Sequence, residues 1–176
     1  MITVVAGVLI ASQYFLIGGL LMLGGGALDL IDGGLARRKG KASKFGAFLD
    51  SVIDRFQEGV VLLALLYYFS SDSCGLVEAM RWDVFGFTSC RVGVLLSYLT
   101  FMASVMVSYL RARAEGLGIH CDVGIMTRPE RVAVIGIAIC VSEWIPQTIL
   151  VVLFLITILC LVTTIQRIVY SWRNLD

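Results

Sequence analysis

The chain alternates long apolar stretches with short polar ones. Five of the stretches are close to the roughly 20 residues that a helix needs to cross a bilayer, and a shorter one stands at the amino-terminal end. They cover residues 2–12, 14–36, 48–70, 91–113, 131–148 and 148–167. This pattern predicts an all-α membrane protein with six transmembrane helices in a single domain, residues 1–176. The first stretch is too short to span unless it is tilted, so we expect the domain to lack its amino-terminal lead-in.

Composition and charge support this prediction and orient the chain. Of the 176 residues, 59% are hydrophobic and only 15% are charged, well below the roughly 25% charged residues of soluble domains. Twelve of the fourteen Lys and Arg residues flank the second polar gap, the fourth polar gap and the carboxyl terminus. Basic residues prefer the cytoplasmic face, so we expect a multi-pass protein of the cell membrane with this face inside. No nucleic-acid partner is expected.

The cysteines suggest no metal site. Cys140 and Cys160 lie in apolar stretches and are interpreted as small core residues. Cys74 and Cys90 both fall in the predicted outer loop. The sequence leaves open whether a disulfide joins them, because it does not give the distance between them.

Four aspartates stand at the cytoplasmic end of the second and third apolar stretches. Asp29 and Asp32 are three residues apart, and Asp50 and Asp54 are four apart, so each pair projects from one face of its helix. Ionised carboxylates at this depth are costly unless cations neutralise them. Oxygen ligands without Cys or His favour Mg²⁺ or Mn²⁺, and such ions commonly bind substrate phosphates as well. The substrate is therefore predicted to be a phosphate ester.

The four aspartates have two other possible roles. The first is a structural ion network with the neighbouring arginines. The second is a divalent-cation transporter, in which acids would follow a path through several helices. The aspartates instead cluster at one face, next to Gly33 and Gly46, where a ligand can approach the backbone, and to Arg37, whose guanidinium suits a phosphate oxygen.

The spacing of these residues resembles the signature of the CDP-alcohol phosphotransferases, membrane enzymes of phospholipid biosynthesis. The matching positions are Asp29, Asp32, Gly33, Ala36, Arg37, Gly46, Asp50 and Asp54. The resemblance implies the family's six-helix fold and a homodimer. It also implies an enzyme that breaks the pyrophosphate of a CDP-linked lipid, releases CMP and transfers the phosphoryl group to an acceptor hydroxyl.

The same resemblance implies roles for individual residues. Two ions, Mg²⁺ or Mn²⁺, would be bound, one by Asp29, Asp32 and Asp50 and the other by Asp29, Asp50 and Asp54. Asp54 would also be the general base that takes the acceptor's proton. The positions implied in binding the CDP-alcohol are Gly33, Arg37, Ser43 and Gly46.

Three shorter motifs concern the acceptor. "SYLRARAEGLG" (108–118), "RPERVAV" (128–134) and "TTIQRIVY" (163–170) resemble the branch that uses inositol phosphate, the phosphatidylinositol phosphate and archaetidylinositol phosphate synthases. The acceptor's phosphate is then expected to bind Ser108, Arg111, Arg131 and Arg167. Topology alone also predicts arginines at cytoplasmic helix ends. Glycerol phosphate, serine, or a CDP-inositol donor meeting inositol phosphate stay open as alternatives, and so does the choice between diacyl and archaeal ether lipids.

Overall fold

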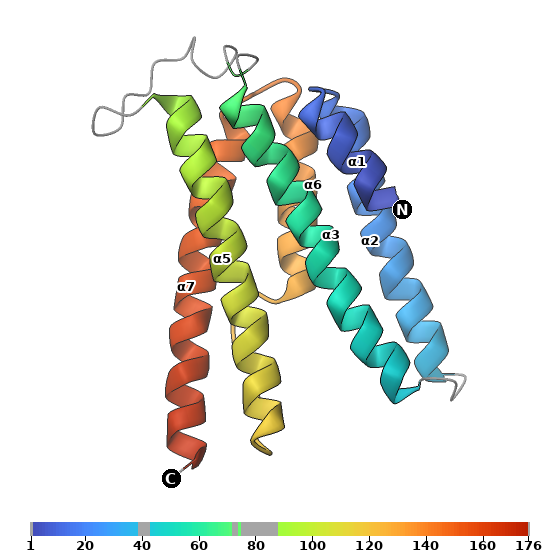
Figure 1. Ribbon diagram of the computed structural model, residues 1–176, viewed down its shortest axis with the longest axis vertical. Coiled ribbons are helices and arrows are strands. Elements are labelled where there is room, and N and C mark those ends of the chain that lie inside the picture. The colour runs from blue at the N-terminus through green and yellow to red at the C-terminus, as the bar shows by residue number, and fades with distance from the viewer. Residues whose placement is uncertain (1, 39–42, 72–73, 75–87, 176) are drawn as a thin grey trace.

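Figure 1 shows the computed structural model of the protein, a bundle of helices that run along its long axis. The structure describes residues 2–38, 43–71, 74 and 88–175, and within 30–38 it describes the backbone alone. The described helices are α1 (Ile2–Ala11), α2 (Phe15–Arg38), α3 (Lys44–Ser70), α5 (Ser89–Gly116), α6 (Arg128–Ser142) and α7 (Thr148–Leu175). Each of the six predicted helices is therefore present.

Local sequence signals account for several helix boundaries. Ser43 is the N-cap of α3, where its hydroxyl accepts a hydrogen bond from the Gly46 amide at 2.9 Å. Pro129 lies in the first turn of α6, where its missing amide proton is not needed. Gly118 follows α5 with a φ of 85°, a conformation that glycine adopts without strain. Helix α6 begins at Arg128, well above the lower ends of α5 and α7 (Figure 1).

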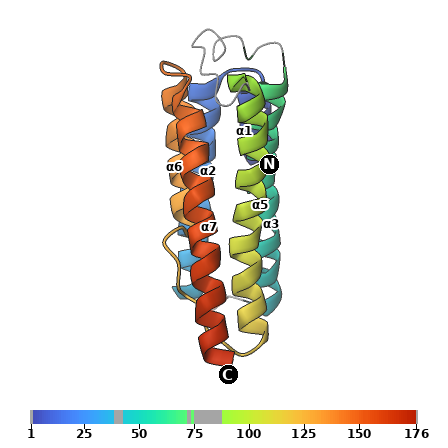
Figure 2. The ribbon, with the colours of Figure 1, turned by 90° about the vertical axis from the view of Figure 1, so that its left-hand side faces the viewer.

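The helices form two layers of three. Figure 2 shows α2, α6 and α7 on one side and α1, α3 and α5 on the other. Within the layers α6 packs against α2 and α7, and α3 packs against α1 and α5. Between the layers α1 packs on α2, and α5 packs on α7. The central helices are thus α6 in one layer and α3 in the other.

The charged segments gather at one end of the bundle, as the sequence predicts. The end of α2, the start of α3, the end of α5 and the carboxyl terminus all lie at the lower end in Figure 1. The opposite end carries the connection from α6 to α7.

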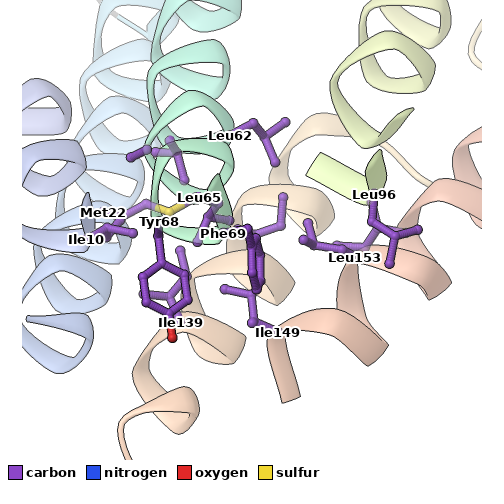
Figure 3. Close-up of a cluster of buried hydrophobic side chains, with 14 of the residues drawn as sticks. Ile10, Met22, Leu62, Leu65, Tyr68, Phe69, Leu96, Ile139, Ile149 and Leu153 are labelled. Carbon is purple, nitrogen blue, oxygen red and sulfur yellow. The ribbon is translucent and has the colours of Figure 1, made fainter. Parts of the chain in front are cut away.

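The apolar core extends along the inside of the bundle, and Figure 3 shows part of it. Leu65, Ile10 and Ile139 are fully buried there, and the rings of Phe15 and Tyr68 meet edge to face with centroids 4.9 Å apart. Close helix contact depends on glycine at α5, because a Cβ atom added to Gly93 would lie 2.4 Å from the ring of Phe69.

The outer surface suits a membrane, although only some helices are clear spans. Large apolar side chains such as Leu63, Leu95 and Phe154 are more than half exposed. By length and hydropathy, α5 and α7 are the described helices able to cross a bilayer. The other helices are shorter in their apolar part or, like α3, carry charged residues along half their length. The prediction of six helices is confirmed, and that of six membrane crossings stays a prediction.

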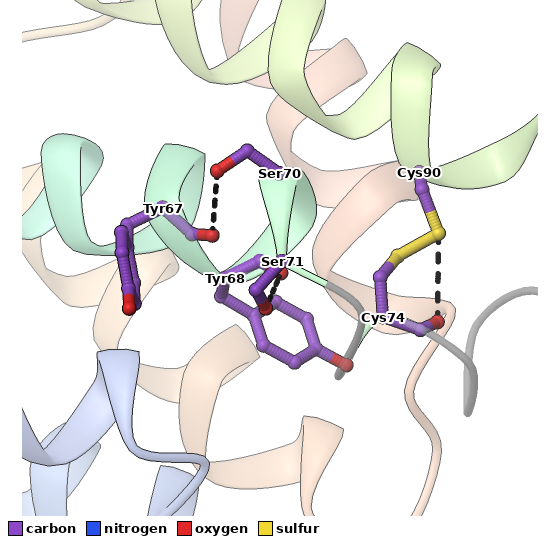
Figure 4. The surroundings of a disulfide bond; sticks show 6 residues. All are labelled: Tyr67, Tyr68, Ser70, Ser71, Cys74 and Cys90. Carbon is purple, nitrogen blue, oxygen red and sulfur yellow. Dashed lines mark hydrogen bonds between the residues drawn. A yellow bond between two sulfur atoms is a disulfide. The ribbon is translucent and has the colours of Figure 1, made fainter.

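A disulfide closes the upper end of the bundle. Cys74 and Cys90 are bonded, with 6.0 Å between their Cα atoms (Figure 4). Cys74 follows the end of α3 and Cys90 lies in the first turn of α5, so the bond ties together two helices that already pack side by side. The question that the sequence left open is answered by this contact.

The contact at Gly93 predicts a measurable stability change. Gly93→Ala should lower the free energy of unfolding by about 1–3 kcal/mol, because the added methyl group overpacks the core against Phe69. Gly24→Ala is the matched control, since a Cβ atom there meets nothing within 4 Å. Denaturant unfolding of the two variants in detergent gives the comparison. Equal stability of both would contradict the packing described.

Candidate active site

Two of the predicted aspartates lie close to the same arginine side chain. Asp29 comes from α2 and Asp54 from α3, and both approach Arg128 in the first turn of α6. The Arg128 Nη2 atom lies 2.6 Å from the Asp54 Oδ1 atom and 3.8 Å from the Asp29 Oδ2 atom. Asp54 is buried. Carboxylates from two helices therefore converge on one point that accepts positive charge.

Of the remaining two aspartates, the structure describes the side chain of Asp50 but not that of Asp32. Asp50 is exposed and lies one helical turn from Asp54, close enough for its charge to act on that residue. The side chains of Asp32, Gly33 and Arg37 lie outside the described residues. Among the side chains that are described, no three of His, Cys, Asp or Glu come close enough together to hold a metal ion.

The donor chemistry nevertheless fits a hard divalent cation. The converging atoms of Asp29 and Asp54 are carboxylate oxygens, the ligands that Mg²⁺ and Mn²⁺ prefer. A guanidinium nitrogen already lies between them as a stand-in cation, which demonstrates that both carboxylates point toward the same place. Asp29 and Asp54 are thus the described residues that would hold such an ion.

Ser43 and Gly46, predicted to bind the CDP-alcohol, lie together at the exposed start of α3. The Ser43 hydroxyl is the helix cap, and a Cβ atom on Gly46 would come within 2.9 Å of it. Glycine at this position therefore leaves room for the Ser43 hydroxyl to cap the helix.

The four residues predicted to bind the acceptor phosphate lie on α5, α6 and α7 but do not share one surface. Arg111 is 44% exposed and pairs with Glu115 and Asp122, at 2.9 and 2.7 Å. Ser108, one turn earlier, lines with it a groove of about 490 Å³ between α3 and α5.

The other two predicted arginines are buried. Arg167 is 3% exposed, and its guanidinium donates to the backbone carbonyls of Val107 and Val123. It lies close enough to Arg111 and Arg131 to interact with their charges. Arg131 is 1% exposed. Of these three arginines, only Arg111 is well exposed.

Arg131 is held by a residue that sequence reasoning missed. Its Nε and Nη2 atoms donate to the two carboxylate oxygens of Glu58, at 2.8 and 3.2 Å, and Nη1 donates to the Met126 carbonyl at 3.3 Å. The Ser104 hydroxyl on α5 donates to the same Glu58 carboxylate at 2.5 Å. A sequence signal existed, because Glu58 continues the four-residue spacing of Asp50 and Asp54 along the same helix.

The pairs Asp54–Arg128 and Glu58–Arg131 form what we term the acid–arginine ladder. The two acids are one turn apart on α3, and the two arginines are one turn apart on α6. The ladder joins the central helices of the two layers. Arg128 was the second residue missed, since its sequence position alone suggested only a cytoplasmic helix end.

A cavity of about 260 Å³ lies beside the ladder, between α1, α2, α3 and α6. Its walls include the apolar Met22 and Val132, and its polar lining comes from four residues. These are Thr3, Gln57, Glu58 and Arg128. A mostly apolar cavity with a few polar groups at one side is typical of a ligand site.

The chain belongs to the CDP-alcohol phosphatidyltransferase family, whose model matches residues 1–173. The archaetidylinositol phosphate synthase of Methanothermobacter thermautotrophicus is 35% identical over 94% of this chain and 74% of its own length. That of Pyrococcus horikoshii is 34% identical over 100% and 80%. Both resemblances identified from sequence motifs, to the family and to its inositol phosphate branch, are confirmed.

Comparison with solved structures shows the same similarity. The phosphatidylinositol phosphate synthase PgsA1 of Mycobacterium tuberculosis with CDP-DAG bound has a TM-score of 0.80 and 26% identity, over 97% of this chain and 80% of that one. The same protein in complex with manganese and citrate has a TM-score of 0.78. Membership of this family makes the chain a membrane phosphotransferase of phospholipid synthesis. The manganese complex shows that one such relative binds a divalent metal.

The buried pair of the ladder predicts a stability effect. Glu58→Ala should lower the free energy of unfolding by about 3–5 kcal/mol, because it leaves the Arg131 charge buried without a partner. Glu58→Leu combined with Arg131→Met should be much less destabilising, since neither charge remains. Denaturant unfolding in detergent tests this, and a single variant as stable as wild type would contradict it.

Proposed function

We propose that the protein transfers the phosphatidyl or archaetidyl group of a CDP-linked lipid to inositol 1-phosphate and releases CMP. The observation that carries the proposal is the convergence of Asp29 and Asp54, two residues of the family signature, on one cation-accepting point beside a cavity. The relatives named as archaetidylinositol phosphate and phosphatidylinositol phosphate synthases support the choice of acceptor.

The aspartates would provide the metal site. In this proposal Asp29, Asp32, Asp50 and Asp54 hold two divalent ions, Mg²⁺ or Mn²⁺. When bound, such ions stabilise negative charge on the attacking and leaving oxygens of an in-line displacement. Asp54 accepts the proton of the acceptor hydroxyl, a role that depends on its position as much as on its basicity.

The substrates would be held by the residues around this centre. Gly33, Arg37, Ser43 and Gly46 would contact the CDP-alcohol, and the exposed cap at Ser43 supports this at one end of α3. Ser108, Arg111, Arg131 and Arg167 would provide the positive field for the acceptor's phosphate. The exposed Arg111 would be the direct contact with that phosphate.

The protein would work in the membrane as a multi-pass homodimer with its active site on the cytoplasmic side. The lower end of the bundle, which carries most of the basic residues, would then face the cytoplasm. The apolar outer surface, with residues such as Leu63 and Phe154 exposed, supports contact with lipid tails.

CMP release by the purified protein tests the function. We expect release that requires CDP-DAG or its archaeal ether counterpart, a divalent metal and inositol 1-phosphate together. Glycerol phosphate, serine and free inositol serve as competing acceptors in the same assay. Faster turnover with any of these would overturn the acceptor assignment, and no metal-dependent CMP release with any acceptor would overturn the proposed function.

The metal site predicts the behaviour of two variants. Asp29→Asn and Asp54→Asn should each reduce kcat by at least about a hundredfold, the usual scale for removing a group that acts on the transition state. Mn²⁺ binding followed by electron paramagnetic resonance should weaken in Asp29→Asn. Glu143→Gln, an exposed acid at the opposite end of the bundle after α6, is the control. Normal turnover of Asp29→Asn at low metal concentration would contradict the two-ion arrangement.

A further inference from the structure

The two pairs of the acid–arginine ladder differ in how fully their hydrogen bonds are used. Arg131 and Glu58 are 1% and 7% exposed, and every nitrogen of the Arg131 guanidinium donates to an oxygen. Ser104 supplies a further donor to Glu58. The guanidinium nitrogens of this pair are thus fully used within the protein.

Arg128 is different, although it lies only one turn away. Its side chain is 26% exposed. Its contacts with Asp54 and Asp29 and its hydrogen bond to the Gln57 amide oxygen, at 3.0 Å, all use one nitrogen, Nη2. Its Nε atom is buried and has no hydrogen-bond partner among the described residues. A buried donor without a partner is costly, and it is expected to have one in the working protein.

The surroundings of Arg128 indicate what that partner is. Arg128 lines the cavity of about 260 Å³ together with Thr3, Gly26 and Gln57. It stands at the amino-terminal end of α6, where the helix dipole adds to its positive charge. Its guanidinium can donate two parallel hydrogen bonds, the geometry that fits two oxygens of a phosphate group.

We propose that Arg128 binds a phosphate group of the substrate next to Asp54, and that the Glu58–Arg131 pair is the element that positions it. Because α6 packs against α2 and α7, the ladder is what orients its first turn toward α3. The phosphate belongs either to the CDP-linked donor or to the phosphorylated acceptor. This inference rests on the proposed function, which supplies both substrates.

The test compares Arg128→Gln and Arg128→Lys with Arg173→Gln, an exposed arginine in the last turn of α7 that has no part in the site. Equilibrium binding of CDP-DAG and of inositol 1-phosphate is measured separately, together with kcat and both KM values. Arg128→Gln should weaken one of the two affinities by about ten- to a hundredfold, the effect of losing a charge-assisted hydrogen bond. Lysine should restore only part of this, because it keeps the charge but not the fork of donors.

The affinity that falls identifies the source of the phosphate. A loss for CDP-DAG assigns Arg128 to the donor, and a loss for inositol 1-phosphate assigns it to the acceptor. Unchanged affinities and unchanged kcat in both Arg128 variants would overturn the inference and leave Arg128 as a partner of the aspartates only. Should Arg128→Gln fail to fold, Arg128→Lys decides by the same criterion.

The positioning role has its own control. Glu58→Gln should weaken the same affinity as Arg128→Gln, whereas Gly93→Ala, which disturbs the core far from the ladder, should lower stability without changing that affinity. Equal effects of Glu58→Gln and Gly93→Ala on binding would overturn the positioning role. A wild-type protein that releases CMP while the Arg128 variants behave normally would overturn this inference alone, and a wild-type protein inactive with every acceptor would overturn the proposed function.

Discussion

Burying ionised side chains inside an apolar helical bundle is the constraint on which the rest of this structure depends. Each buried charge is tolerated only with a partner and with its remaining hydrogen bonds satisfied. The acid–arginine ladder gives each of its charges a partner between α3 and α6, the central helices of the two layers, and the Glu58–Arg131 pair also has its hydrogen bonds satisfied. Apolar packing joins the layers at their edges, through α1 with α2 and α5 with α7. At the centre, the charged side chains of the ladder and a cavity lie next to the apolar core.

The ladder also separates structure from chemistry along the depth of the bundle. Glu58 and Arg131 lie deeper, are saturated with protein partners and hold three helices together through Ser104. Asp54 and Arg128 lie one turn closer to the charged end, and their contacts are incomplete. A catalytic centre needs groups with unused bonding capacity, and rigid neighbours keep such groups in place. The same residue types therefore serve two purposes at two depths.

Much of the architecture followed from sequence patterns. Apolar stretches of near-spanning length located all six helices, with boundaries shifted by a few residues. The shift is largest at the end of α7, predicted to stop at 167 but continuing to Leu175. Helix α6, predicted over 131–148, ends at Ser142, because the segment up to Pro146 turns and does not continue the helix. Cys74 and Cys90 illustrate the limit of such patterns, since their bond depends on α3 and α5 packing side by side.

The sequence by itself determined the family, the acidic signature and the end of the bundle where the chemistry lies, because helical spacing places Asp50 and Asp54 on one face and charge asymmetry orients the chain. Only the tertiary structure decided which charges meet. Glu58 and Arg131 are 73 positions apart, and neither spacing nor composition predicts their contact. Arg131 and Arg167 stay predicted acceptor ligands by motif, while their guanidinium groups lie against a carboxylate and backbone carbonyls. Pairing between distant helices depends on how those helices pack, and local sequence does not encode that distance.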